Sequence, residues 1–197
     1  MAAISRERWS RASWLCLLAA ACGGRAATAG NGTAAPASGG VVPLGRAIVL
    51  ETAGPPPPDT TVTFTAGDPR TITLRHGPPD NIVFAELVFP ASAFRADSGQ
   101  EVRVEVRPRP GVYGLEVQVS RPVGEGASLV FKYARFFSAP VRAREVYGSD
   151  ILYERALAIG LLQPGPQLAF LSSTRPASDN LRAPFTTAGT YLVAAAQ

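Results

Sequence analysis

The sequence predicts an all-β protein, an antiparallel sandwich that follows a signal peptide and a disordered tether. Short apolar alternations recur from Leu44 onward, and turns rich in glycine and proline separate them. The chain contains 19 Gly and 18 Pro, a composition that disfavours a bundle of helices. Strands do not alternate with long helical patterns, as they would in a parallel βαβ fold. The sequence therefore favours antiparallel sheets over helical and parallel architectures.

The first half of the predicted domain has the most regular alternation. Residues 47–50 are apolar and predict the first strand. Residues 55–58 are consecutive prolines, which form a polyproline II spacer or a rigid surface loop. Residues 60–65 and 70–75 alternate strictly and are rich in β-branched side chains, so they predict two strands. Residues 82–89 are almost continuously apolar, which is typical of a strand in the core.

The second half contains one ambiguous stretch. Residues 101–107 and 112–119 form the clearest pair of strands, with a Pro- and Gly-containing turn between them. Residues 150–162 have apolar positions that also fit the 3.6-residue period of a helix, but their turn-rich surroundings favour a strand over residues 151–162. Further strands are expected at residues 129–137, 141–147, 167–171 and 190–195.

Residues 1–21 predict a secretory signal peptide. Basic residues precede the apolar stretch 14–21, which is too short to span a bilayer, since a span needs about 20 apolar residues. The stretch ends in Leu18-Ala-Ala-Ala-Cys22-Gly-Gly, which resembles the lipobox of bacterial lipoproteins, with Ala19 where that family most often has Leu. The resemblance implies cleavage before Cys22 and lipidation of Cys22, which would anchor the mature chain in a membrane. The alternative is plain secretion, with Cys22 incidental.

The lipobox implies a bacterial cell envelope location. Gly23 gives no Asp-type retention signal, so outer-membrane sorting is the default in a cell with two membranes. Residues 22–43 comprise the lipidated Cys22 and a flexible tether, because their Gly-, Ala- and Ser-rich composition cannot bury a core. Residues 44–197 are then a single all-β domain. Cys16 would be lost with the signal, so no disulfide or thiolate metal site is expected.

The basic character of the chain is concentrated at its start. The formal net charge is +4, and removing the charged side chains of residues 1–14 lowers it to +2. In residues 101–107, acidic and basic side chains alternate with apolar ones, which predicts a solvated, charge-mixed strand face. Mixed charges of this kind bind phosphates poorly, so we expect no nucleic-acid partner.

The order of segments between about residues 71 and 196 resembles the ZU5-like β-sandwich modules of some bacterial envelope proteins. Residues 89–94 are similar to the family's apolar-Pro-x-Gly-Ala-Leu step, with Ser92 where Gly is usual. Residues 179–194 are similar to its closing element, with Pro184 where the family usually has His. Residues 99–106, 113–117 and 126–133 are similar to the strands that the family has between these two elements. The resemblance implies an immunoglobulin-like, ZU5-like sandwich that is a structural or interaction module without catalytic residues.

Reactive side chains are scarce. His76 is the only imidazole and follows a strand beside a turn, where we expect it to be exposed. Lys132 falls within a strand and should lie at the surface. None of the serines that could serve as nucleophiles (Ser92, Ser149 and Ser172) lies in a Gly-x-Ser-x-Gly elbow, and carboxylates do not cluster as in calcium sites. The sequence therefore predicts no catalytic residue, no cofactor and no metal site.

These features predict a non-catalytic, lipid-anchored cell-envelope protein that acts as a structural or protein-interaction module. One alternative is a carbohydrate-binding accessory lipoprotein with exposed Tyr147 and Tyr153, although aromatic side chains in strands more often pack in a core. The absence of Trp after Trp14 also disfavours this alternative. A second alternative is a secreted hydrolase that combines His76 with a serine and an acid, or two carboxylates in a cleft.

Replacing Cys22 with Ala is expected to move the protein from the membrane fraction to the soluble fraction, because the acyl chains that hold it would have no attachment point. Fractionation and metabolic labelling with a radioactive fatty acid would measure this change. Cys16→Ala is the matched control and should keep the label. A wild-type protein that takes up no label would contradict the prediction.

Overall fold

The computed structural model describes residues 39–197, and all element bounds below refer to this part. The predicted signal peptide, Cys22 and most of the predicted tether lie outside the described residues. The first strand begins at Val41, three residues before the predicted start of the domain at Leu44. None of the helices within residues 39–197 is long and apolar enough to cross a membrane.

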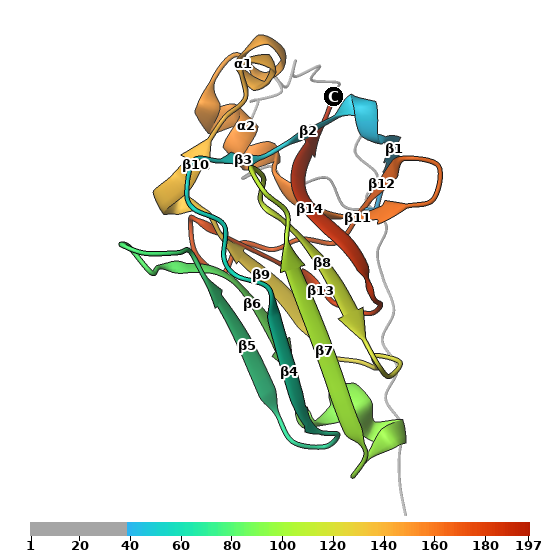
Figure 1. Ribbon diagram of the computed structural model, residues 1–197. Coiled ribbons are helices and arrows are strands. Elements are labelled where there is room, and N and C mark those ends of the chain that lie inside the picture. Colours follow the sequence, from blue (N-terminus) through green and yellow to red (C-terminus); the bar gives the residue numbers. More distant parts are fainter. Residues whose placement is uncertain (1–38) are drawn as a thin grey trace, which may run out of the picture. The chain divides into compact units, whose positions relative to one another are not determined.

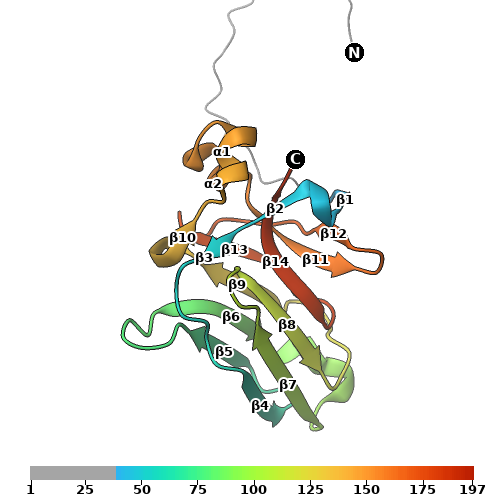
Figure 2. The same ribbon diagram turned by 45° about the horizontal axis from the view of Figure 1, so that its top comes forward.

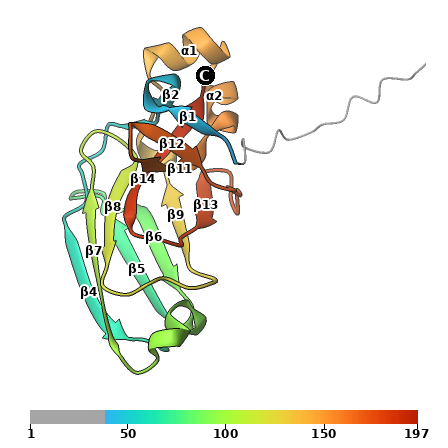
Figure 3. The ribbon, with the colours of Figure 1, turned by 90° about the vertical axis from the view of Figure 1, so that its right-hand side faces the viewer.

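Two antiparallel sheets face each other and form a sandwich, which confirms the predicted fold class (Figures 1 and 3). The larger sheet has the order β1 (Val41–Pro43), β12 (Gln167–Phe170), β11 (Ala158–Gln163), β14 (Gly189–Ala196), β8 (Gly114–Val119), β7 (Glu101–Pro108) and β4 (Thr60–Thr65), and β2 (Ala47–Val49) pairs with β14. The smaller sheet has the order β13 (Asn180–Pro184), β9 (Ser128–Lys132), β6 (Val83–Phe89) and β5 (Arg70–Arg75). A third pairing joins β10 (Phe137–Ser138) to β3 (Glu51–Thr52).

The strand β14 lies at the centre of the larger sheet. It pairs with β11 along one edge, and with β8 and then β2 along the other. Its residues 191–195 are buried one after another, because the sheet carries a second small core on its outer face around Leu168 and Phe170. Gly160 on β11 permits this packing, since a Cβ there would lie 2.5 Å from the side chain of Leu168.

A β-bulge in β6 sends an extra aromatic ring into the main core. Leu74 pairs with Ala85 and Arg75 pairs with Val83, so Phe84 is the additional residue between them. A bulge turns its extra residue away from the regular alternation, and here Phe84 and Ala85 are both buried. The Phe84 ring stacks on Tyr113, which immediately precedes β8 of the opposite sheet, at a centroid distance of 5.1 Å. The bulge therefore joins the two sheets through their aromatic side chains.

Two predicted strands are helices. Residues 141–147 form α1 (Val141–Tyr147), and residues 150–156 form α2 (Asp150–Ala156), which leads into β11. Gly148 ends α1 in the left-handed region at φ 76°, and the Oγ of Ser149 accepts a hydrogen bond from the N–H of Leu152 at the start of α2. Because these residues cap helices, the prediction of strands over residues 141–147 and 151–156 was wrong. The rest of the predicted strand, from residue 158 to 162, belongs to β11.

Other elements differ in extent. The predicted strand 129–137 is divided into β9, a 3₁₀ turn η3 (Ala134–Phe136) and β10. The strands β1, β3 and β13 and the 3₁₀ segments η1 (Leu44–Arg46) and η2 (Ala91–Asp97) were not predicted, since they are short or carry no regular alternation. The helices α1 and α2 lie at the end of the sandwich that also holds β1, β2 and the end of β14, as Figures 1 and 2 show.

Phe84→Ala is expected to lower the free energy of unfolding by about 3–5 kcal/mol, because it opens a cavity between the sheets. Urea denaturation followed by circular dichroism would measure the loss. Thr73→Ala, on the exposed face of the adjacent strand, is the control and should cost less than about 1 kcal/mol. Equal effects for the two variants would contradict the role assigned to the bulge.

Candidate functional site

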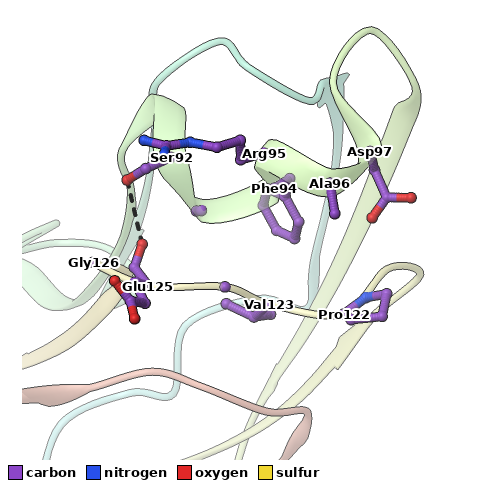
Figure 4. A pocket seen from close by; sticks show the side chains of 11 residues that line it. Ser92, Phe94, Arg95, Ala96, Asp97, Pro122, Val123, Glu125 and Gly126 are labelled. Carbon is purple, nitrogen blue, oxygen red and sulfur yellow. Dashed lines mark hydrogen bonds between the residues drawn. The ribbon is translucent and has the colours of Figure 1, made fainter.

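An open groove of about 770 Å³ lies between η2 and the segment that leads from β8 to β9. We call it the η2 groove; it is lined by residues 92–97 and 122–126. Figure 4 shows Phe94 pointing from η2 toward the segment that carries Val123, with Arg95 and Glu125 at the margins. The groove lies at the end of the sandwich opposite α1 and α2 (Figures 1 and 3).

Both walls of the η2 groove are fastened to each other and to the core. The N–H of Gly124 donates to the carbonyl of Ala93 at 2.7 Å, and the hydroxyl of Ser92 donates to the carbonyl of Glu125 at 3.3 Å. The Phe94 ring is buried against Phe89, at a centroid distance of 5.4 Å. These contacts hold the two walls of the groove together.

The side chains at the groove carry both signs of charge. The Arg121 guanidinium donates to a carboxylate oxygen of Asp97 at 3.1 Å, so this pair neutralises itself at one end. Arg95 and Glu125 are exposed at the margin of the groove and carry opposite charges. A mixed polar margin over an apolar floor suits an extended polypeptide segment, which presents alternating polar backbone and side-chain groups.

His76, predicted to be exposed, is 1 % exposed, so that prediction was wrong. It follows Ile72 and Leu74 at intervals of two residues, and the alternation of β5 therefore directs it into the core. Its Nδ1 lies 2.8 Å from the carbonyl of Pro55, which can only accept, so Nδ1 carries the proton. Its Nε2 is buried without a hydrogen-bond partner in the described residues.

Aromatic rings enclose the imidazole of His76. The rings of Phe84, Tyr113 and Phe136 meet it edge to face at centroid distances of 5.1, 6.3 and 4.6 Å. Gly54 is required beside it, because a Cβ there would lie 2.9 Å from Nδ1 and 2.5 Å from the Phe136 ring. In this position, His76 helps to hold the loop around Pro55 against the sandwich.

The candidate serines lie apart from His76. Ser149 caps α2, Ser92 belongs to the η2 groove, and Ser172 is exposed beyond β12. Lys132 lies partly exposed on β9, with its Nζ 3.2 Å from a carboxylate oxygen of Glu86. Within residues 39–197, no group of three His, Cys, Asp or Glu side chains is close enough to hold a metal ion.

The charge-mixed face predicted for residues 101–107 is confirmed on β7. Glu105 accepts hydrogen bonds from Arg103 at 2.9 Å and from Arg107 at 3.5 Å on the same face of the strand. Arg107 also lies 3.9 Å from the carboxylate of Glu116 on β8. The arginines of this face are thus largely neutralised by neighbouring carboxylates.

A hydrogen-bonded cluster fastens α2 to the smaller sheet. The Tyr133 hydroxyl lies 3.2 Å from a carboxylate oxygen of Glu154 and 3.2 Å from the carbonyl of Ser178. Arg175 donates to the Tyr133 hydroxyl and to the carbonyls of Glu154 and Leu157 at the end of α2. A guanidinium here satisfies carbonyls that the end of a helix leaves free.

The tyrosines do not form an exposed platform. Tyr113, Tyr133, Tyr153 and Tyr191 are buried, and Tyr147 is half-buried. Burial raises the pKa of Tyr113, Tyr133 and Tyr191 from the ordinary 10.0 to about 12, and it also raises the pKa of Tyr153 and Tyr147. The aromatic side chains considered for glycan binding therefore belong mainly to the core.

The η2 groove was missed in the sequence analysis because it joins segments nearly thirty residues apart. The available signals were the irregular stretch after Pro90 and the glycines at positions 124 and 126. No protein-family model, curated protein or solved structure matches the chain.

The buried tyrosines predict a late alkaline titration. Between pH 10 and 12, the unfolded chain loses tyrosyl protons that the folded protein keeps, so the free energy of unfolding falls as the pH rises. Phenolate absorbance should therefore rise together with the loss of the circular dichroism signal. The chain in denaturant is the control and should titrate near pH 10. Ionisation of most tyrosines near pH 10 in a folded protein would contradict the prediction.

Proposed function

We propose that this chain is a non-catalytic, lipid-anchored cell-envelope protein whose β-sandwich binds an extended segment of a partner protein in the η2 groove. The observation that carries the proposal is the groove itself: a preformed hollow with an apolar floor and a margin of mixed charge. Its walls are held by hydrogen bonds within the fold, so a partner would not have to order them on binding.

The anchor is proposed from the sequence. The segment from Leu18 to Gly24 has the small residues and the cysteine that the attachment of a lipid requires. Two or three acyl chains on Cys22 give stable attachment, whereas a single chain gives marginal attachment. In a cell with two membranes, the absence of Asp after Cys22 favours the outer membrane. The groove would then face away from the attached end of the domain.

The proposal of a non-catalytic role rests on how the reactive side chains are engaged. The imidazole of His76 donates to Pro55 and is enclosed by aromatic rings, where a substrate has no access to it. Ser92 is the one candidate serine in the η2 groove, and its hydroxyl donates to a backbone carbonyl. The burial of four of the five tyrosines likewise makes a protein partner a better proposal than a glycan.

A photo-crosslinking amino acid at position 95, in the groove, should capture one stoichiometric envelope partner in living cells. The same amino acid at position 73, on the outer face of the smaller sheet, should not capture it. Ala96→Trp fills the groove from an exposed position and is expected to reduce the captured partner about tenfold, as loss of a central contact does.

Ala91→Trp is the matched control, because Ala91 is exposed on the same 3₁₀ segment but does not line the groove. It should leave the capture unchanged. Equal capture from positions 95 and 73, or capture that Ala96→Trp does not reduce, would contradict the proposed groove. Recovery of a bound glycan in place of a protein would favour the carbohydrate-binding alternative.

A further inference from the structure

We infer that the two helices α1 and α2, which we call the two-helix tip, rest on the surface of the lipid bilayer that holds the anchor. The inference rests on the proposed lipidation of Cys22 and adds an orientation for the domain. It begins with the distribution of exposed aliphatic side chains. Large hydrophobic side chains that are highly exposed occur at five positions in the described part of the chain: Val41 (58 %), Val141 (78 %), Val146 (45 %), Ile151 (62 %) and Leu152 (51 %).

Four of these five side chains belong to the two-helix tip, and the fifth belongs to β1. Single exposed aliphatic side chains are normal on a soluble domain, but their concentration on one end points to an apolar contact. Each helix has seven residues, which is too short to span a bilayer. The geometry therefore fits a contact in which the helices lie on the membrane and their exposed aliphatic side chains reach the boundary between headgroups and acyl chains.

The two-helix tip is joined directly to the segment through which the chain enters the domain. Arg142 of α1 donates to the carbonyl of Gly45 at 3.1 Å, and Gly45 lies two residues after β1. The Tyr147 hydroxyl donates to the carbonyl of Ala196, and the buried Tyr153 donates to the carbonyl of Ile48 at 3.1 Å. The tip and the beginning of β1 thus belong to the same end of the sandwich (Figures 1–3).

The number of residues before β1 limits how far this end can lie from the proposed anchor. Eighteen residues separate Cys22 from Val41. Even a fully extended chain of that length spans at most about 65 Å. Tethering at such a distance gives an effective concentration in the millimolar range, so a few aliphatic side chains suffice for a contact that a free domain would not maintain.

The charges of the two-helix tip indicate what kind of membrane contact it makes. Three arginines (Arg142, Arg144 and Arg155) are balanced by three acids (Glu145, Asp150 and Glu154). Arg144 donates to both carboxylate oxygens of Asp150, at 2.7 and 2.8 Å. A balanced tip has no net attraction to anionic headgroups, so the contact should form on zwitterionic lipid and resist salt.

A tryptophan reporter tests the inference directly. Both tryptophans of the chain, Trp9 and Trp14, precede the predicted cleavage site, so the mature protein would contain none. Leu152→Trp and Ile151→Trp each place a single indole on the tip at an exposed position. Thr73→Trp is the matched control on the outer face of the smaller sheet.

Each mature, membrane-extracted variant is reconstituted into phosphatidylcholine vesicles whose acyl chains are brominated and therefore quench indole fluorescence. Both tip reporters should be quenched about twofold or more, and the control should remain unquenched, because only the tip reaches the acyl region. The quenching should persist at high salt. Mass spectrometry of the same samples reports whether Cys22 carries acyl chains.

The outcomes separate the inference from the function on which it rests. Acylated Cys22 with unquenched tip reporters would overturn the membrane contact and leave the anchor intact. Unmodified Cys22 would overturn the proposed anchor, and it would also overturn the orientation of the tip, which depends on that anchor. Equal quenching at the tip and at position 73 would also overturn the inference, since the domain would then have no preferred face. Unquenched reporters in a protein that forms dimers would assign the tip to an interface between two copies.

Discussion

The fold depends on the pairing of β14 with three other strands. Its first half pairs with β8 and its second half with β2, while β11 covers the opposite edge. Without it, the larger sheet would divide into the set β1, β12 and β11 and the set β8, β7 and β4. Since both faces of residues 191–195 are also buried, the strand shares its side chains between two cores. Small residues at positions 194 and 195 fit this crowded position, where larger side chains would force the layers apart.

The sequence predicted those parts of the fold that depend on local alternation. Strands β4, β5 and β7 were found because polar and apolar side chains alternate strictly on them. The helix α1 was missed, and a helix over the residues of α2 was considered but not favoured, because seven residues are too few for a helical period to outweigh the neighbouring turns. His76 was misplaced because its position next to a turn was given more weight than its register with Leu74. The η2 groove depends on contacts between distant segments, such as that of Gly124 with Ala93, which no local pattern contains.

The two ends of the sandwich have different chemistry. One end carries exposed aliphatic side chains on α1 and α2 and lies next to the start of β1. The other end carries the η2 groove, in which charges of both signs surround an apolar floor. The proposed membrane contact and the proposed partner site therefore lie at opposite ends of the sandwich. Between them, the interior is filled by packed aromatic rings such as those of Phe84, Tyr113 and Phe131.

The position of β14 in the chain also affects when folding can occur. This central strand comes after every other described strand in the sequence, so a growing chain cannot complete the larger sheet until residue 196 has been synthesised. Until then, β8 and β11 present open edges and lack their shared partner. The complete sandwich therefore cannot form while the residues before β14 are being synthesised. A chain that stops short of β14 would therefore keep its local hairpins, such as β7 with β8, but leave the two halves of the larger sheet without a common strand.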